Sequence, residues 1–292
     1  MTILADGFRY ARPSTLDEAL ALMGEPGAMV LAGGQTLIPR LTAGIAAPKV
    51  LVDLGGLSGL KLIQEIGLEL AIGSMVTLAE VIRSATLERH CPLLPQGAAK
   101  TATPSVRNRG TLVGNLAWAD PASQLPVVAL AIDAVFRIGR SGGFRLVAAR
   151  DFFSAPNVTA VTDGEMVTHL HVKAFPERTG SGLADVAPRR NSRALATAAA
   201  VITIDTAGRI ERASLAVGGC GDVPRRCGMV ESKLIGSPAA DAPGIAAAAL
   251  LAHPPQKGGG VLDAEYAIAV LPVLLRDAVR DACFAARNLP AK

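Results

Sequence analysis

Two glycine-containing stretches constrain what this chain of 292 residues can fold into more than any other feature. The first reads LAGGQTLIP over residues 31–39, and the second reads RNRGTLVGNL over residues 107–116 and continues into ADPAS at 119–123. Small residues let a backbone approach a ligand closely, and neighbouring N–H groups in such a turn can converge on an anion. We therefore expect the two stretches, named here the first and second glycine loops, to close on one phosphate-containing ligand.

The first glycine loop lies in a small βαβ-like pattern. A strand and then a helix are predicted over Phe8–Leu22, with a Ser or Thr N-cap before Leu16, and short buried strands over Ala28–Leu31 and Val50–Leu54. The apolar residues after Gly34 predict a helix at the βα junction. The G-x-G-x-x-G motif of NAD-binding loops and the G-x-x-x-x-G-K-[ST] motif of ATP-binding loops are absent, so this unit is not a Rossmann domain. Without that fingerprint we do not interpret Asp53 as a ribose-binding acid.

The remaining chain predicts an α+β fold with two further parts. Strands are expected over Lys61–Ile66, Glu69–Ile72, Ala134–Ile138, Phe144–Val147 and Glu165–Val172, and helices over Leu78–Ser84, Leu93–Thr101 and Leu125–Ile132. The Pro, Gly and Ser residues of Phe175–Arg190 predict a mobile connection. After it we expect a β pair over Ala194–Asp205 and Ile210–Val217, then helices over Ala239–Ala252 and Ala264–Ala286. The predicted domains are 1–56, 57–175 and 186–288.

Composition excludes several classes of protein. Half of the residues are hydrophobic, but no apolar run reaches the ~18 residues of a membrane-spanning helix, and the first residues lack an export signal, so a cytoplasmic protein is expected. The net charge is +4, yet the arginines are scattered and aromatic residues make up only 3 %, which disfavours nucleic-acid binding.

Metal and cluster chemistry is also disfavoured. The four cysteines form no CxxC pair, so no iron–sulfur or zinc centre is expected, and Cys220 and Cys227 are interpreted as free thiols although they could approach each other. His169 and His171 alternate on a predicted strand, and without a nearby set of Cys or carboxylate ligands we interpret them as surface or interface residues. No catalytic constellation of side chains is defensible from spacing.

Both glycine loops match motifs of one family. Residues 32–39 are similar to A-G-G-[HQ]-[ST]-L-[IL]-P, and residues 107–115 to I-R-N-x-G-T-[IL]-G-G-N, in the FAD-binding medium subunit of molybdenum hydroxylases, the carbon monoxide dehydrogenase and xanthine dehydrogenase family. Weaker matches lie at 52–54, 72–74, 151–153, 164–165, 187–190, Tyr266 and Arg276. The resemblance covers nearly the whole chain, and two loops in the right order and spacing are more specific than either alone.

The resemblance implies a three-part architecture: a small N-terminal α+β unit and a larger α+β unit that together form a two-part FAD-binding region, followed by a C-terminal antiparallel sheet with helices. FAD would lie between the first two parts, with its pyrophosphate held by the two loops. The residues then expected to bind FAD are Leu31, Ala32, Gly33, Gly34, Gln35, Thr36, Leu37, Thr101, Ala102, Gly110, Thr111, Leu112, Gly114, Asn115, Ala117, Ser123, Gln124 and Val167.

The same resemblance implies partners: a large molybdopterin subunit, a small subunit with two 2Fe-2S clusters, and assembly as a dimer of heterotrimers. Electrons would pass from the clusters through this chain's FAD to an external acceptor, and no catalytic side chain or metal ligand is assigned here. The alternative is a non-catalytic nucleotide-binding or assembly protein with weakened FAD binding. A free-standing flavin oxidase would need a substrate base, and the sequence indicates none.

Three positions depart from the family pattern. Val113 replaces the first Gly of G-G-N, so the loop either accepts a Cβ there or is reshaped. Gln124 replaces an acidic residue, and Asp185 lies near the place of the family's linker lysine. Two further questions stay open. Trp118 either packs within the protein or faces the flavin or a partner's cluster. Arg107 and Arg109 either attract the anionic FAD or form surface ion pairs.

Overall fold

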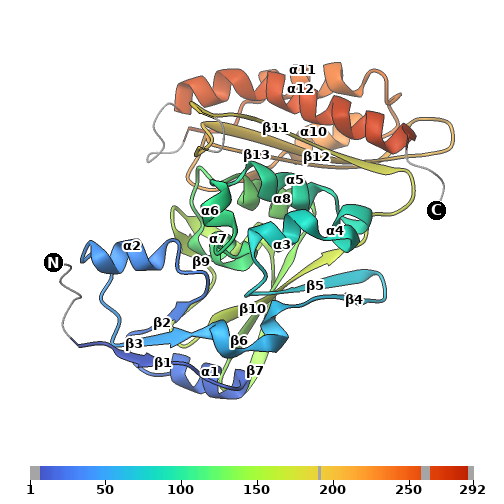
Figure 1. The fold of residues 1–292 in the computed structure, drawn as a ribbon. Coiled ribbons are helices and arrows are strands. Elements are labelled where there is room, and N and C mark those ends of the chain that lie inside the picture. Colours follow the sequence, from blue (N-terminus) through green and yellow to red (C-terminus); the bar gives the residue numbers. More distant parts are fainter. Residues whose placement is uncertain (1–6, 190–191, 258–263, 289–292) are drawn as a thin grey trace.

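The computed structural model describes residues 7–189, 192–257 and 264–288, and Arg190 of the 187–190 motif lies outside them. The chain forms three units stacked along one direction, with the N-terminal unit at the bottom of Figure 1 and the C-terminal unit at the top. Within the described residues, no helix is both long and apolar enough to cross a membrane.

The N-terminal unit is a three-stranded parallel sheet in the order β1-β3-β2, formed by Arg9–Ala11, Val50–Asp53 and Ala28–Leu31. Two helices connect these strands: α1 (Leu16–Met23), whose N-cap Thr15 accepts from the Glu18 N–H, and α2 (Leu37–Thr42), which follows the first glycine loop. The predicted βαβ-like unit and the Thr N-cap are confirmed. Short 3₁₀ turns, η1 (Leu54–Gly56) and η2 (Ser58–Lys61), lead to the central unit.

The central unit is built on a five-stranded antiparallel sheet in the order β4-β5-β10-β6-β7. Its strands are β4 (Ile63–Ile66), β5 (Glu69–Gly73), β10 (Met166–Lys173), β6 (Val135–Arg140) and β7 (Gly143–Ala148). The helices are α3 (Leu78–Arg83), α4 (Ala85–His90), α5 (Leu93–Lys100), α6 (Pro104–Arg107), α7 (Leu112–Trp118), α8 (Gln124–Ala131) and α9 (Ala149–Phe152), and a small hairpin pairs β8 (Phe153–Ala155) with β9 (Val158–Thr159).

One face of the central sheet supports the helices through the largest hydrophobic core. Phe136 and Ile138 of β6 and Leu170 of β10 point into it, because alternate residues of a strand share a face. Phe136 also stacks on Phe152 with ring centroids 3.6 Å apart. This core positions α7 and the segment before it, and therefore the second glycine loop.

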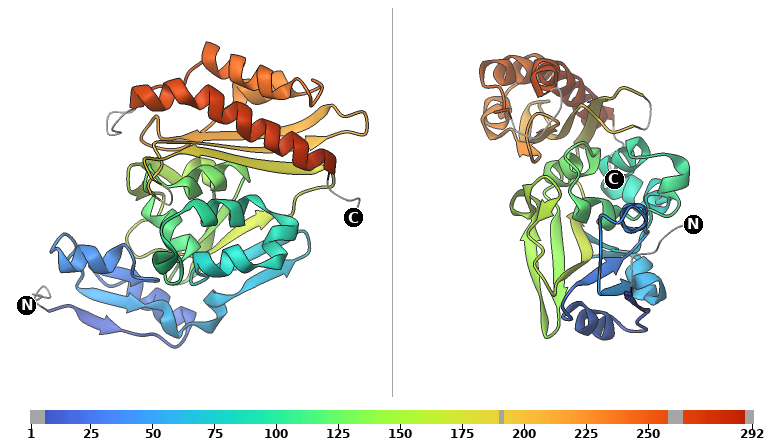
Figure 2. Two further views of the ribbon diagram at one scale, coloured as in Figure 1. Left: turned by 45° about the horizontal axis from the view of Figure 1, so that its top comes forward. Right: turned by 90° about the vertical axis from the view of Figure 1, so that its left-hand side faces the viewer.

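The C-terminal unit is a four-stranded antiparallel sheet of β11 (Thr179–Val186), β12 (Ala196–Ile204), β13 (Ile210–Gly218) and β14 (Arg225–Arg226). Its helices are α10 (Gly228–Leu234), α11 (Ala242–Ala252) and α12 (Ala264–Asn288), and α12 runs along the sheet (Figure 2). The mobile connection predicted over Phe175–Arg190 is wrong, because residues 179–186 form β11. Gly180 and Gly182, which suggested a linker, instead let α12 approach β11: a Cβ on either would lie 2.1 Å from a carbonyl oxygen of α12.

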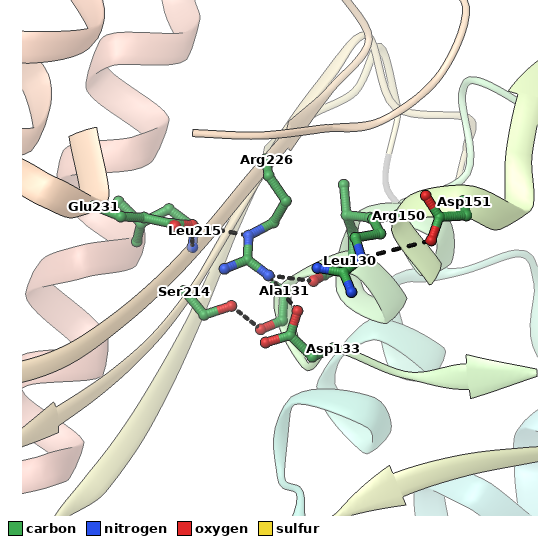
Figure 3. A network of polar contacts seen from close by, with 9 residues as sticks. All are labelled: Leu130, Ala131, Asp133, Arg150, Asp151, Ser214, Leu215, Arg226 and Glu231. Atoms are coloured by element: carbon green, nitrogen blue, oxygen red, sulfur yellow. Dashed lines mark hydrogen bonds and ion pairs between the residues drawn. The ribbon is translucent and has the colours of Figure 1, made fainter. Parts of the chain in front are cut away.

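A partly buried polar network attaches the C-terminal unit to the central unit (Figure 3). The guanidinium of Arg226 donates to Glu231 at 2.8 Å, to the Leu130 carbonyl at 3.2 Å and to Asp133 at 2.5 Å. Ser214 also donates to the Ala131 carbonyl. The end of α8 is therefore hydrogen-bonded to β13 and β14.

Candidate functional site

A cavity of about 1000 Å³ lies between the N-terminal and central units. One wall consists of residues 23–30 and the first glycine loop, and the other of the second glycine loop together with residues 161–167. Binding cavities for cofactors have volumes of this order and commonly lie between structural units. The two glycine loops, far apart in the sequence, thus border one cavity, as predicted.

The two loops touch each other through Gly33. A Cβ placed on Gly33 would lie 2.0 Å from the carbonyl oxygen of Arg109 and 2.9 Å from the Cα of Gly110, so only glycine fits this approach. Gly34 has a φ of +73°, the left-handed conformation in which glycine is favoured. The glycines are needed here to bring the two units together.

The first glycine loop presents unused hydrogen-bond donors. The N–H groups of Gly33, Gly34, Gln35 and Thr36 donate to no atom within the part of the chain that the structure describes. Partly exposed N–H groups in succession bind anions without requiring a basic side chain. In the second loop, the N–H groups of Thr111 and Val113 are likewise without an acceptor among the described residues.

Most of the residues predicted to bind FAD line this cavity. They are Ala32, Gly33, Gly34, Gln35, Thr36, Leu37, Ala102, Gly110, Thr111, Gly114, Asn115, Ala117 and Val167. Ala102 adopts a φ of +56°, unusual for a residue with a Cβ, and its carbonyl accepts from Arg107 at 2.8 Å. That arginine also donates to the Ala99 carbonyl, so it holds the end of α5 in place rather than forming a surface ion pair.

Five predicted residues are not among those that line the cavity. They are Leu31, Thr101, Leu112, Ser123 and Gln124. Ser123 donates to Asn115 Oδ1 at 2.8 Å and thereby orients a residue that does line the cavity. Thr101 donates to the Gly97 carbonyl, and Leu112 is fully buried in the central core. Their proposed contacts with FAD remain predictions.

The departures at Gln124 and Asp185 form one polar cluster. Gln124 is buried and donates to Asp185 Oδ2 at 3.2 Å, while Lys100 forms an ion pair with the other carboxylate oxygen of Asp185. Asp185 lies on β11, so this cluster connects the C-terminal unit to the end of α5. The carboxylate of Asp185 is thus paired with Lys100 and Gln124 and does not border the cavity.

Val113 does not require a reshaped loop. Thr111 is the N-cap of α7, and its side chain accepts from the Gly114 N–H. The second glycine loop is therefore helical from Leu112 onward. Val113 has an ordinary helical backbone and a buried side chain in the central core. A Cβ is therefore accommodated at this position.

Several residues that line the cavity were not predicted to bind FAD. Arg40 of α2 lies over the ring of Trp118, 4.7 Å from its centroid, and both border the cavity, so Trp118 packs against the arginine from the opposite unit. Asn157 lines the cavity and donates to the Trp118 carbonyl at 3.0 Å. No local motif identifies these residues, because tertiary packing alone brings their segments together.

Glu165 provides a charged and rigid part of the wall. Its carboxylate accepts from Arg145 at 2.8 and 2.6 Å and from the Thr162 N–H at 3.0 Å. The Arg145 guanidinium holds the pKa of Glu165 at about 2 despite its burial. The family match at Gly164-Glu165 and the predicted strand over Glu165–Val172 were the sequence signals for this segment.

The remaining candidates provide no redox or metal centre. All four cysteines are buried free thiols, and burial raises the pKa of Cys91 and Cys227 to about 12. His169 and His171 lie half-buried on β10, the middle strand of the central sheet, and burial lowers the pKa of His169 to about 4. Among the described residues no group of three His, Cys, Asp or Glu side chains could hold a metal ion.

Comparisons with known proteins agree with this architecture. Residues 6–173 match the family described as the FAD binding domain in molybdopterin dehydrogenase, and residues 185–282 match the CO dehydrogenase flavoprotein C-terminal domain. The chain belongs to the FAD-binding medium subunits of the molybdenum hydroxylase family, oxidoreductase subunits of molybdopterin-dependent complexes.

Individual relatives give the same result. The chain is 32 % identical to the carbon monoxide dehydrogenase medium chain of Afipia carboxidovorans over 98 % of this chain and 100 % of that protein. It is 34 % identical to the 6-hydroxypseudooxynicotine dehydrogenase complex subunit alpha of Paenarthrobacter nicotinovorans, over 79 % and 78 % of the two. The solved Cu,Mo-CO dehydrogenase superposes with a TM-score of 0.89 at 30 % identity, covering 97 % of this chain and 100 % of that one.

The cavity fits an FAD-binding domain on structural grounds. Unpaired N–H groups in both loops suit a diphosphate, and a Cβ on Gly33 would drive the loops apart.

Proposed function

We propose that this chain is the FAD-carrying electron-transfer subunit of a heteromeric molybdenum hydroxylase. A small partner subunit with iron–sulfur clusters supplies electrons, a large molybdopterin subunit oxidises the substrate, and an external acceptor receives the electrons. We further propose a cytoplasmic complex that assembles as a dimer of heterotrimers.

The observation that carries this proposal is the meeting of two donor-rich glycine loops at one cavity. Gly33, Gly34, Gln35 and Thr36 contribute N–H groups from one side and Thr111 from the other, so a diphosphate is neutralised by backbone donors. FAD, when bound, supplies the capacity to take up and release electrons. The residues of this chain hold it, exclude water from it and set its electrostatic surroundings.

The cysteines agree with an electron supply from outside the chain. All four are buried and free, and among the described residues none belongs to a group of three His, Cys, Asp or Glu side chains that could hold a metal ion. Electron transfer through a bound flavin requires no general acid or base from this chain. Binding and positioning of the cofactor are the tasks that fit this geometry.

The test is to purify the chain together with the proteins encoded beside it. We expect a complex that contains one flavin per copy of this chain, together with molybdopterin and iron–sulfur clusters that this chain does not bind when purified alone. The chain alone should still bind FAD, seen as flavin absorbance near ~450 nm, a general property of flavins.

Two outcomes would contradict the proposal. A complex without stoichiometric flavin would favour the alternative of an assembly protein with weakened nucleotide binding. A chain that carries flavin but forms no complex with cluster-containing partners would remove the electron-transfer role. Reduction of the flavin by substrate in the complex, but not in the isolated chain, is the result that the proposal requires.

A further inference from the structure

Three buried side-chain atoms in the described part of the chain have no hydrogen-bond partner: Ser74 Oγ, His171 Nε2 and Ser181 Oγ. A buried polar group without a partner costs free energy, so such a group requires an explanation. Ser74 differs from the other two because its residue lines the cavity between the N-terminal and central units. His171 and Ser181 do not border that cavity.

The position of Ser74 is rigidly determined. Its N–H donates to the Thr168 carbonyl at 2.9 Å, and the next residue, Met75, donates to the Leu60 carbonyl at 2.8 Å. Two residues further on, the Val76 carbonyl accepts from the Leu112 N–H at 3.0 Å. The hydroxyl is thus carried on a segment that is hydrogen-bonded directly to the second glycine loop.

The side chain has little freedom to find another partner. Ser74 is 3 % exposed and lies at the end of β5, beside β10, where the neighbouring residue Val167 also lines the cavity. A serine hydroxyl both donates and accepts, so it suits the phosphate, ribityl and ribose oxygens of a dinucleotide. Because this hydroxyl has no protein partner and belongs to a residue that lines the cavity, a ligand there could bond to it without a protein hydrogen bond being broken first.

We propose that Ser74 Oγ is a hydrogen-bonding contact for FAD, additional to the residues of the two glycine loops. This inference rests on the proposed function, because it assumes that FAD fills the cavity. Ser74 belongs to the weak family match at 72–74 but was not among the residues predicted to bind FAD.

The test compares two serine-to-alanine variants of the full chain. Ser74→Ala removes the unpartnered hydroxyl of a residue that lines the cavity, and Ser181→Ala removes an unpartnered hydroxyl of a β11 residue that does not line it. Each protein is freed of flavin and titrated with FAD, following the quenching of flavin fluorescence. We expect Ser74→Ala to bind FAD about fivefold more weakly than the parent, the effect of one hydrogen bond, and Ser181→Ala to bind it equally well.

A second measurement separates binding from folding. Because Ser74 Oγ has no partner in the protein, its removal should leave the thermal midpoint of the flavin-free chain unchanged or slightly raised. A lowered midpoint with unchanged FAD affinity would overturn the inference, as would an equal loss of affinity in both variants. A parent chain that binds no FAD at all would instead defeat the proposed function itself.

Discussion

The central unit meets its two neighbours in opposite ways. Towards the C-terminal unit the contact is filled by the chain: Leu183, Ala199 and Ala216 belong to the same core as the helices of the central unit, and Arg226 completes the contact with a polar network. Towards the N-terminal unit, the backbones meet at Gly33 and Arg109, but a cavity of about 1000 Å³ lies beside them. The first interface is filled by side chains and ion pairs, whereas the second leaves N–H donors of the glycine loops without an acceptor among the described residues.

The difference between the two interfaces indicates which of them a bound ligand would stabilise. Apolar side chains and paired charges make the C-terminal contact stable without any cofactor. The N-terminal contact is incomplete until an anion meets the loop donors, so binding should stabilise the arrangement of these two units. Substitutions at the two interfaces should therefore change different measured quantities.

The largest effect is expected from Gly33→Ala. The new Cβ would meet the Arg109 carbonyl at 2.0 Å, and because backbone cannot move aside cheaply, the two loops must separate. FAD affinity should fall by at least ~100-fold in a flavin titration. Gly59→Ala is the matched control, since a Cβ there meets no atom within 4 Å and should leave binding intact. Equal affinities for the two variants would contradict the contact between the loops.

A second prediction concerns the C-terminal interface. Arg226→Ala removes the donor to Glu231 and to the Leu130 carbonyl, leaving a partly buried carboxylate and a buried carbonyl with fewer partners. We expect the free energy of unfolding in urea to fall by about 3 kcal/mol while FAD affinity stays the same. Arg280→Ala, which removes an exposed arginine of α12, should change stability little. A loss of FAD affinity in Arg226→Ala would show that the interfaces are not independent.

A third prediction uses pH to examine the cavity wall. Because the pKa of Glu165 is lowered to about 2, its ion pair with Arg145 contributes stability that is fully present above the unfolded-state value of about 4.3. This contribution is lost as the pH falls through that window towards 2. Glu165→Gln should lower the free energy of unfolding by about 2 kcal/mol at pH 7 and flatten its dependence below pH 4. An unchanged acid dependence would show that this carboxylate is not held by Arg145.

The smallest effect is expected from Gly244→Ala in α11. The same substitution that is destructive at Gly33 meets open space here, and alanine favours a helix more than glycine does. The free energy of unfolding should rise by about 0.5 kcal/mol, with no change in FAD affinity. A destabilised variant would mean that α11 is more crowded than the structure indicates.

The sequence by itself determined most of the local elements and the positions of the two glycine loops. The Ser or Thr N-cap predicted before Leu16 is Thr15, and it could be predicted because capping depends on residues three positions apart. The strand over Glu165–Val172 and the glycine loops were recognisable for the same reason: their signals are local. The family resemblance, carried by two short motifs, is confirmed by the family matches over residues 6–173 and 185–282. The domain bounds at 56, 175 and 186 remain a prediction.

Only the tertiary structure decided what surrounds those loops. The sequence predicted a mobile connection over 175–190 because glycine is typical of flexible segments. In the structure, Gly180 and Gly182 are instead required by the close approach of α12. The pairing of Asp185 with Lys100, and the unpaired hydroxyl of Ser74, likewise depend on contacts between residues distant in sequence. A local pattern encodes backbone conformation, but the partner of a buried polar group is set by packing, and that packing determines which residues face the cavity.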